Sequence, residues 1–396
     1  MPPELIDIAE ARARVLAAVA PGPVEEVAVG EANGRVLGED VAAAGDSPPF
    51  DSSAMDGYAV VAGAAAELPV VDESRAGRPA QLALAAGEAI RISTGAAVPE
   101  GADSVIPVER VEELGDSVRV PDWAADRNIR RAGEDMRAGA AVLAAGTPVG
   151  PAELAVLVAA GAEHVRCAVR PRVAVLATGD ELVEPGEPLG PGQIRNSNAY
   201  ALGALAERAG AEVVLRRRVP DDARVTRDEL AAAIEAADVV CVSGGVSVGP
   251  HDHVKPALEA LGVEERFWGV RVKPGKPTWF GVAPGGGLVF GLPGNPVSAM
   301  VTFHLFARPA LRRLAGADPG DVRARAVLDA AVALSPRREQ VLRCRLAARD
   351  DGWHVEPTRE QGSHILTSML GAGALALVPA GDGELTAGER VQIQLL

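Results

Sequence analysis

Hydrophobic residues follow two alternating patterns through the middle of the chain, from residue 171 to residue 315. Short apolar runs rich in β-branched residues are typical of buried strands, and segments with apolar residues at helical spacing lie between them. This alternation with short connections predicts a mostly parallel sheet covered by helices on both faces, a three-layer α/β domain. We expect strands at 172–177, 212–215, 238–242, 267–272, 278–282 and 288–292, and helices at 198–209, 228–236, 252–261 and 297–314.

The regions before and after this section have other periodicities. Residues 46–131 are rich in turn residues and short β-type runs, which indicates a small β-rich domain inserted into an N-terminal α+β region. In that N-terminal region we expect helices at 5–19, 30–41 and 147–161 and a strand at 24–29. After residue 316, short runs separated by regular turns predict a small β-barrel-like domain. The expected segments are 1–45 with 132–170, 46–131, 171–315 and 316–396.

Composition and charge exclude several classes of protein. The chain of 396 residues is too long for one core, and its low aromatic content of 3% predicts cores built from Ala, Val and Leu. A formal net charge of -15 argues against nucleic acid or an anionic membrane as a partner. The three cysteines form no CxxC pair, and we find no signal peptide and no apolar run that could span a bilayer. A cytoplasmic location is therefore expected.

The segment around which the chain is organised runs from Asp238 to Lys255 and reads DVVCVSGGVSVGPHDHVK. A strand that enters a glycine-rich turn and then a helix is suited to bind an anion, because backbone N–H groups and the helix dipole point the same way. Asp252 would repel a bare phosphate, so a divalent cation between the two groups is the more reasonable arrangement. The alternative is an ordinary βα connection, and this segment does not decide between them.

Three polar or glycine-rich turns follow strands of the expected sheet. They are Thr178 to Glu181, Ser243 to Asp252 and Gly291 to Pro296. Ligands of such sheets bind at the carboxyl ends of the strands, so we expect the three turns to lie at one edge. This clustering is the main evidence in the sequence for a binding site.

Three further polar segments each allow two interpretations. Asp51, Ser52, Ser53 and Asp56 could form Asx-turns or a metal or phosphate cluster, and the spacing favours the turns. Arg130 and Arg131 with Glu134 and Asp135 could be a solvated paired turn or a wall of a charged cleft. In the sequence VKPGKP, Lys273 and Lys276 are held on a stiff loop, which slightly favours anion binding over simple solvation. His364 is expected at the surface, and no catalytic triad or metal-ligand motif stands out.

Eight motifs together identify a family. PPFDSSAMDGYAV, RISTGAAVPEGAD, NIRRAGEDM, TGDEL, SGGVSVGPHDHVK, VKPGKP, GLPGNPVSAM and QGSH occur in the order and approximate spacing of the MoeA and gephyrin E-domain family, the molybdopterin molybdenumtransferases. The chain resembles this family over nearly its whole length, although only QGSH supports the match in the C-terminal region.

The resemblance implies an activity and an assembly. The implied reaction inserts molybdate into adenylyl-molybdopterin, requires Mg²⁺ and releases AMP. The implied protein is a cytoplasmic homodimer with four domains per subunit, in which 1–45 with 132–170 serves dimerisation and 171–315 binds molybdopterin, and it could contact other enzymes of molybdenum cofactor biosynthesis. Two alternatives remain: a molybdopterin adenylyltransferase, which residues 171–314 alone resemble, and a pterin-binding scaffold without turnover.

The resemblance also implies roles for individual residues. Glu181, Asp252 and one of the pair Asp221 and Asp222 would face the metal, while the sequence leaves open which member of the pair does so. Molybdate, a tetrahedral dianion, needs cationic and hydroxyl groups, which Lys273, Lys276, Ser363 and Arg343 would supply. Asp56, Thr94 and Asp135 would complete the cleft from the other subunit. The pterin nucleotide would be held by Thr178, Gly179, Asp180, Asn198, Ser243, Gly244, Gly245, Ser247, Pro293, Gly294 and Asn295.

Overall fold

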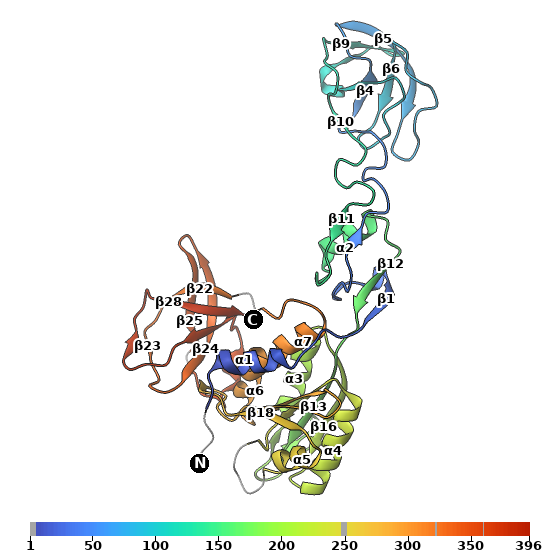
Figure 1. Cartoon of the computed structure of the whole chain (residues 1–396). Coiled ribbons are helices and arrows are strands. Elements are labelled where there is room, and N and C mark those ends of the chain that lie inside the picture. Colours follow the sequence, from blue (N-terminus) through green and yellow to red (C-terminus); the bar gives the residue numbers. More distant parts are fainter. Residues whose placement is uncertain (1–4, 247–251, 321–322, 359) are drawn as a thin grey trace. The chain divides into compact units, whose positions relative to one another are not determined.

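The computed structural model describes residues 5–246, 252–320, 323–358 and 360–396. The chain forms two compact units, one made of residues 1–25 with 168–396 and the other of residues 26–167 (Figure 1). No helix in the described part of the chain is both long and apolar enough to cross a membrane.

The larger unit contains a six-stranded sheet that is mostly parallel, as the sequence predicts. Its first four strands pair in parallel, and the last two pair antiparallel at one edge. In spatial order the strands are β16 (Glu212–Val219), β13 (Arg172–Thr178), β17 (Val239–Ser243), β21 (Leu288–Leu292), β20 (Trp279–Val282) and β18 (Glu264–Trp268).

Helices cover both faces of this sheet, because side chains alternate between the faces along each buried strand. In β17, Val239 and Cys241 belong to the hydrophobic core on one face, and Val240 and Val242 belong to the core on the other. The first face is covered by α1 (Ile8–Ala17), α3 (Ser197–Arg208), α6 (Pro296–Thr302), η3 (Phe303–Ala307) and α7 (Arg308–Leu314), and the second by α4 (Ala223–Ala236) and α5 (Val254–Ala260).

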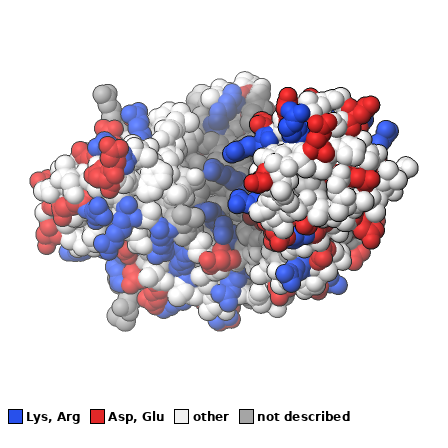
Figure 2. Space-filling model, turned by 90° about the horizontal axis from the view of Figure 1, so that it is seen from above, with Lys and Arg blue, Asp and Glu red and all other residues white. Residues whose placement is uncertain are grey.

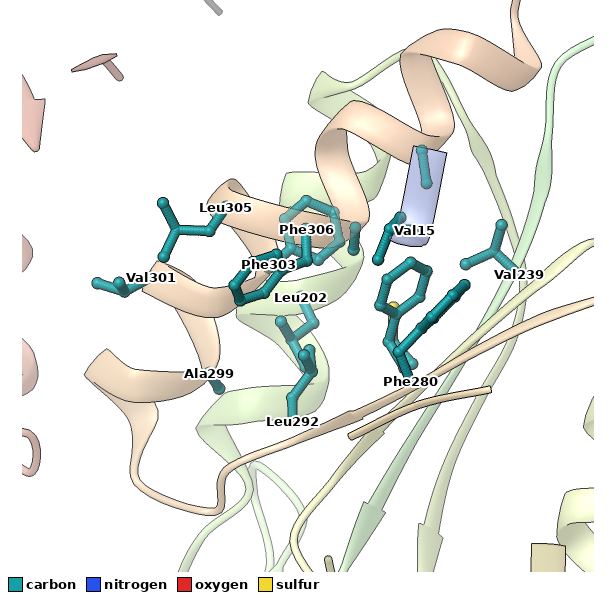
Figure 3. Close-up of a cluster of buried hydrophobic side chains, with 14 of the residues drawn as sticks. Val15, Leu202, Val239, Phe280, Leu292, Ala299, Val301, Phe303, Leu305 and Phe306 are labelled. Carbon is teal, nitrogen blue, oxygen red and sulfur yellow. The ribbon is translucent and has the colours of Figure 1, made fainter. Parts of the chain in front are cut away.

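Phenylalanine is concentrated in the first of these cores (Figure 3). Five of the six phenylalanines of the chain lie there, and the rings of Phe280 and Phe290 have centroids 4.9 Å apart. Val15 from α1, Leu202 from α3 and Phe306 from η3 point into the same cluster. The low aromatic content therefore does not describe this core, because the few aromatic residues are gathered in one place.

The helix expected at 297–314 is present but is interrupted by a π-helical turn, η3. Pro309 follows this turn and has no N–H to donate to the carbonyl of Leu305, four residues earlier. A π-turn is one of the ways in which a helix accommodates such a lost hydrogen bond.

The C-terminal strands form a closed five-stranded barrel, which confirms the expected β-barrel-like domain. The barrel closes because β26 (Ala374–Val378), which ends the series of paired strands, also pairs with β24 (Glu339–Arg349). The short strand β19 (Val272–Lys273) pairs with β24, so the VKPGKP loop is attached to the barrel. The barrel strands are β24 (Glu339–Arg349), β25 (Gly352–Pro357), β22 (Arg323–Leu328), β28 (Arg390–Leu395) and β26 (Ala374–Val378); beside them lie the pair β23 (Val332–Ala333) and β27 (Glu384–Leu385), and the 3-10 helix η4 (Leu366–Met369).

The smaller unit contains a second six-stranded sheet, in the region where a β-rich insert is expected. Its strands, in order, are β7 (Ser104–Pro107), β4 (Gly57–Val60), β6 (Ala89–Ile92), β5 (Ala66–Ser74), β9 (Ser117–Val120) and β8 (Glu112–Glu113). Three two-stranded pairs accompany it: β3 (Ser52–Ser53) with β10 (Ile129–Arg130), β2 (Val41–Ala42) with β11 (Ala141–Leu143), and β1 (Val24–Ala28) with β12 (His164–Ala168). The unit also holds α2 (Pro151–Ala159) and the single turns η1 (Val29–Glu31) and η2 (Val108–Arg110).

The prediction of a helix at 30–41 is wrong. Only the single turn η1 forms there, and Gly34 then adopts a φ of +73° that a helix does not allow. Val36 and Leu37 instead make isolated β-bridges to Pro148 and Cys167. These partners lie more than 100 residues away in the sequence, so no local pattern could have indicated them.

The aromatic core yields a first prediction. Phe290→Ala removes a fully buried ring from between two layers, and we expect it to lower the free energy of unfolding by about 3–5 kcal/mol. Thermal or urea unfolding followed by tryptophan fluorescence would measure the change. Phe50→Ala, at a residue that is 45% exposed, serves as the control and should change stability little. Equal effects of the two substitutions would contradict this account of the core.

Candidate functional site

A cavity of about 800 Å³ lies at the carboxyl ends of β13, β17 and β21. All three turns singled out in the sequence contribute to its wall. Of the residues expected to bind a ligand there, the lining includes Thr178, Gly179, Glu181, Asn198, Asp221, Ser243, Gly244, Gly245, Asp252, Pro293, Gly294 and Asn295. Ser247 lies outside the described residues.

The turn after β17 is packed so tightly that it requires glycine. Gly244 has a φ of +93°, and a Cβ atom built on it would lie 2.7 Å from the hydroxyl oxygen of Thr178. The Cα atom of Gly244 also lies 3.7 Å from the position of a Cβ atom on Gly294. The turns after β13, β17 and β21 therefore approach one another through bare backbone.

One side chain ties these elements together. The Nδ2 group of Asn198, in the first turn of α3, donates to the hydroxyl of Ser243 and to the carbonyl of Gly294, each at 2.7 Å. The Ser243 hydroxyl in turn donates to the carbonyl of Pro293 at 3.2 Å. One amide group thus fixes the start of α3 against two of the strand-end turns.

The start of α3 gives the cavity a partial positive charge. Ser197 and Asn198, the first two residues of the helix, line the cavity, and Asn196 caps the helix by accepting a hydrogen bond from the N–H of Ala199. The N-terminus of a helix favours an anion, because its N–H groups are unpaired and its dipole is positive there.

Three carboxylates line the same cavity: Glu181, Asp221 and Asp252. The Glu181 carboxylate lies over the preceding turn, since a Cβ atom on Gly179 would approach its oxygens to 2.3 Å. Among the described residues, no three His, Cys, Asp or Glu side chains are grouped closely enough to hold a metal ion by themselves. A magnesium ion commonly takes only one or two carboxylates and completes its shell with water and substrate phosphates, so this arrangement fits it.

The structure distinguishes the two neighbouring aspartates. Asp222 is the N-cap of α4, and its Oδ1 accepts hydrogen bonds of 2.9 Å from the N–H groups of Arg224 and Val225. Asp221 lines the cavity and is joined to Asp180 by reciprocal backbone-to-carboxylate hydrogen bonds of 3.1 and 3.4 Å. Of the pair, Asp221 is therefore the one that can face a ligand.

The chain contains three lysines among its 39 cationic residues, and two of them lie in the VKPGKP loop. Lys273 and Lys276 are exposed, and the structure gives neither ammonium group a hydrogen bond or ion pair with any residue it describes. Pro277, next in sequence, lines the cavity. The loop therefore reaches the cavity wall through Pro277, whereas its two lysines, both available cations, are not among the lining residues.

The barrel domain contributes His364 and Leu366 to the cavity wall. His364 was expected at the surface, and it is indeed exposed, but it faces the cavity. Ser363 does not line the cavity; its carbonyl accepts a hydrogen bond of 3.2 Å from the N–H of Val297, at the start of α6. In the sequence, the QGSH motif was the signal that could have indicated this part of the cavity wall. Leu182 of β14 (Leu182–Val183) and Pro277 come from the TGDEL and VKPGKP motifs. The lining residues that the sequence did not indicate are Ala177, Ser197, and Ile194 and Arg195 of β15 (Ile194–Arg195).

Arg343 is fully buried and does not line the cavity. Burial lowers the pKa of its guanidinium group from the usual value. Its Nη1 group has no hydrogen-bond partner among the described residues.

Asp56, Thr94 and Asp135 belong to the smaller unit. The N–H of Thr94 donates to Asp56 Oδ1 at 2.9 Å, so these two residues form one exposed group. The N–H of Asp135 instead donates to the carbonyl of Ser47.

The polar residues between 47 and 60 are held by hydrogen bonds within their own segment and to residues 131 and 132. The Ser53 hydroxyl donates to the carbonyl of Met55 at 2.6 Å, as a residue that satisfies its own turn does. The Asp51 carboxylate accepts hydrogen bonds from the N–H of Ala132 and from the side chain of Arg131, and both lower its pKa. The guanidinium group of Arg131 therefore pairs with Asp51 and Asp126, while its backbone N–H donates to Glu134 Oε2 at 3.0 Å.

The charges on the surface do not form one large patch of a single sign on the face drawn in Figure 2, where acidic and basic side chains are interspersed. The net charge of -15 is thus compatible with local cationic groups such as Lys273 and Lys276.

Comparison with known proteins places this architecture in one family. Residues 6–161 match the MoeA N-terminal region (domains I and II), residues 174–313 a probable molybdopterin-binding domain, and residues 325–396 the MoeA C-terminal region (domain IV). The molybdopterin molybdenumtransferase of Haemophilus influenzae is 36% identical over 98% of both chains, and the molybdopterin molybdenumtransferase 2 of Mycobacterium tuberculosis is 40% identical over 92% of this chain and 93% of that one. The crystal structure of the molybdopterin biosynthesis MoeA protein of Pyrococcus horikoshii superposes with a TM-score of 0.84, at 32% identity, over 99% of this chain and 100% of that chain. The chain therefore belongs to the molybdopterin molybdenumtransferase (MoeA) family.

Proposed function

We propose that this protein inserts molybdate into adenylyl-molybdopterin and releases AMP. The observation that carries the proposal is the cavity of about 800 Å³, which three strand-end turns form within the segment that matches a molybdopterin-binding domain. The relatives that match nearly the whole chain are named molybdopterin molybdenumtransferase, and this chain has the N- and C-terminal regions that a single-domain adenylyltransferase lacks. Neither the adenylyltransferase nor the scaffold alternative is favoured.

The cavity suits the pterin nucleotide because its walls offer backbone N–H groups and the positive end of α3 to an anionic pyrophosphate. In this proposal the ligand is held by the three strand-end turns and by Asn198, which fixes the turns after β17 and β21. Thr178, Gly179, Asp180, Ser243, Gly244, Gly245, Pro293, Gly294 and Asn295 belong to these turns. Ser247, which the resemblance also implies, lies outside the described residues.

One or two of the lining carboxylates Glu181, Asp221 and Asp252 would hold a magnesium ion, and Asp222 would not, because it caps α4. When bound, the ion neutralises charge on the phosphates. Cleavage of the anhydride then needs an oxygen nucleophile placed in line with the leaving AMP, and no covalent protein nucleophile. The bond from that oxygen to phosphorus forms as the bond to the bridging oxygen breaks.

Molybdate would be held by Lys273 and Lys276, with Ser363 and Arg343 from the barrel domain. The two exposed ammonium groups on one loop repel each other, and a tetrahedral dianion between them removes that repulsion. Asp56, Thr94 and Asp135 would complete the cleft from the second subunit of a homodimer. We place this homodimer in the cytoplasm, where it could contact other enzymes of molybdenum cofactor biosynthesis.

The reaction gives a direct test. Incubation of the protein with adenylyl-molybdopterin, molybdate and Mg²⁺ should release AMP faster than the same mixture without protein, and removal of Mg²⁺ with EDTA should stop the release. AMP measured by chromatography is the readout. Release at the rate of the protein-free mixture would refute the proposed function.

Asp252 tests the acidic wall of the cavity. Asp252→Asn keeps the size of the side chain but removes its charge, and we expect AMP release to fall by about 100-fold or more, in line with the loss of one electrostatic contact in an active site. Asp228→Asn, at an exposed residue in α4, is the matched control and should release AMP at the normal rate. An unchanged rate for Asp252→Asn would remove this residue from the proposed metal site.

The two lysines test the proposed molybdate site. Lys273→Met and Lys276→Met should each raise the molybdate concentration at half-maximal AMP release by about 10-fold, since each loses a charge-assisted contact. The arginine substitutions retain the charge and should recover part of the affinity. Arg266→Met is the control, because Arg266 is exposed and pairs with Glu264 on the edge strand β18. A molybdate dependence that none of these substitutions alters would contradict the assignment.

A further inference from the structure

Trp268, the last residue of the edge strand β18, faces the core that α5 covers. Phe267 belongs to the core on the first face of the sheet, and Trp268 packs against the core on the second, because successive residues of a strand point to opposite faces. Its cross-strand partner is Trp279 of β20, so the indole lies on the antiparallel edge of the sheet. Neither β18 nor β20 lines the cavity, so any part that this edge plays in the reaction is indirect.

The indole N–H of Trp268 fixes the chain shortly after it leaves β17. It donates to the carbonyl of Val246 at 3.0 Å. Val246 is buried and lies beyond the end of β17 at Ser243, and among the described residues no backbone N–H donates to its carbonyl. A buried carbonyl without a donor is costly, so the indole satisfies a group that lies outside the ladder of the sheet.

The ring of Trp268 also contacts the chain where it enters α5. The ammonium nitrogen of Lys255 lies 4.3 Å from the centroid of the ring, which is a cation–π contact. Lys255 also pairs with Glu265 at 3.6 Å, and Glu265 accepts a hydrogen bond of 2.6 Å from the indole of Trp279. An exposed ion pair contributes little by itself, but the two contacts together hold Lys255 on the edge strands.

The start of α5 packs directly on the glycine turn of the cavity. A Cβ atom on Gly245 would lie 2.7 Å from the Cγ2 atom of Val254. Val254 and Val246 are both buried in the core on the second face. Asp252 lines the cavity and lies only two residues before Val254. Its backbone position therefore depends on the contacts that fix the chain on either side of it.

We propose that Trp268 is a positioning residue, which holds Asp252 in the cavity wall by fixing the chain on both sides of it, at Val246 and at Lys255. This inference rests on the proposed function for the part that Asp252 plays in the reaction. Leucine or phenylalanine could fill the same apolar space, whereas tryptophan offers both an N–H donor for a carbonyl and a large ring face for an ammonium group. The antiparallel edge of the sheet then supports the site from outside the cavity.

Hydrogen exchange of the full-length protein without ligand tests the mechanical part of the proposal. In Trp268→Leu, which loses both contacts, we expect the backbone amides of α5 to exchange at least about 10-fold faster, while those of α4 on the same face of the sheet stay unchanged. Lys255→Met removes one contact and should accelerate the same amides less, so the proposal stays testable if Trp268→Leu does not fold. Trp353→Leu, at an exposed tryptophan of the barrel, is the matched control. Normal exchange of α5 in both variants would overturn the proposal.

Kinetics in two backgrounds separate the positioning of Asp252 from a general loss of stability. Trp268→Leu should lower AMP release by about 10-fold in the otherwise unmodified protein, because a displaced catalytic group loses its alignment. In a protein that already carries Asp252→Asn, the same substitution should lower the rate by less than about 2-fold, since the two changes act through one group. Trp268→Phe keeps the ring for Lys255 and should retain more of the rate than Trp268→Leu. Equal losses in the two backgrounds would contradict the positioning role.

The proposed function and the role of Trp268 can fail separately. If the unmodified protein releases no AMP from adenylyl-molybdopterin with molybdate and Mg²⁺, the proposed function fails. The exchange of α5 in Trp268→Leu and Lys255→Met then still decides whether Trp268 fixes the chain on both sides of Asp252.

Discussion

The hydrogen bonds of Asn198 are the contact on which the site depends. Two bonds of 2.7 Å from one amide group join the start of α3 to Ser243 after β17 and to Gly294 after β21. The turns can come so close only because Gly244 has no side chain at a φ of +93°. Without this connection the turns after β17 and β21 would not be tied to each other and to α3. With it, they form one wall that offers backbone N–H groups and a helix N-terminus to an anion.

Local structure gives the two neighbouring aspartates Asp221 and Asp222 different contacts. Asp222 is committed to the N-cap of α4 and stabilises the helix, whereas Asp221, one residue earlier, faces the cavity. The two carboxylates are adjacent in sequence but differ in what their oxygens contact. A helix boundary thus decides which of two identical side chains is available to a ligand in the cavity.

The barrel and the sheet domain share the cavity through two connections. The VKPGKP loop leaves the sheet domain and pairs with β24 of the barrel, and the carbonyl of Ser363 in the barrel domain accepts a hydrogen bond from the first turn of α6. Both connections bring polar groups to one side of the cavity. The barrel is therefore more than an appended domain.

Local patterns in the sequence determined most of the elements and the edge of the sheet at which the site lies. The runs of apolar residues located β13, β17 and β21, and the glycines after them located the turns, because these signals depend on neighbouring residues alone. The tertiary structure decided what depends on distant partners. It replaced the helix expected at 30–41 by β-bridges to Pro148 and Cys167, chose Asp221 over Asp222, buried Arg343 and turned His364 toward the cavity. In each case the deciding contact joins elements that are separate in the sequence, or depends on where a helix begins. The local spacing of residues therefore cannot predict it.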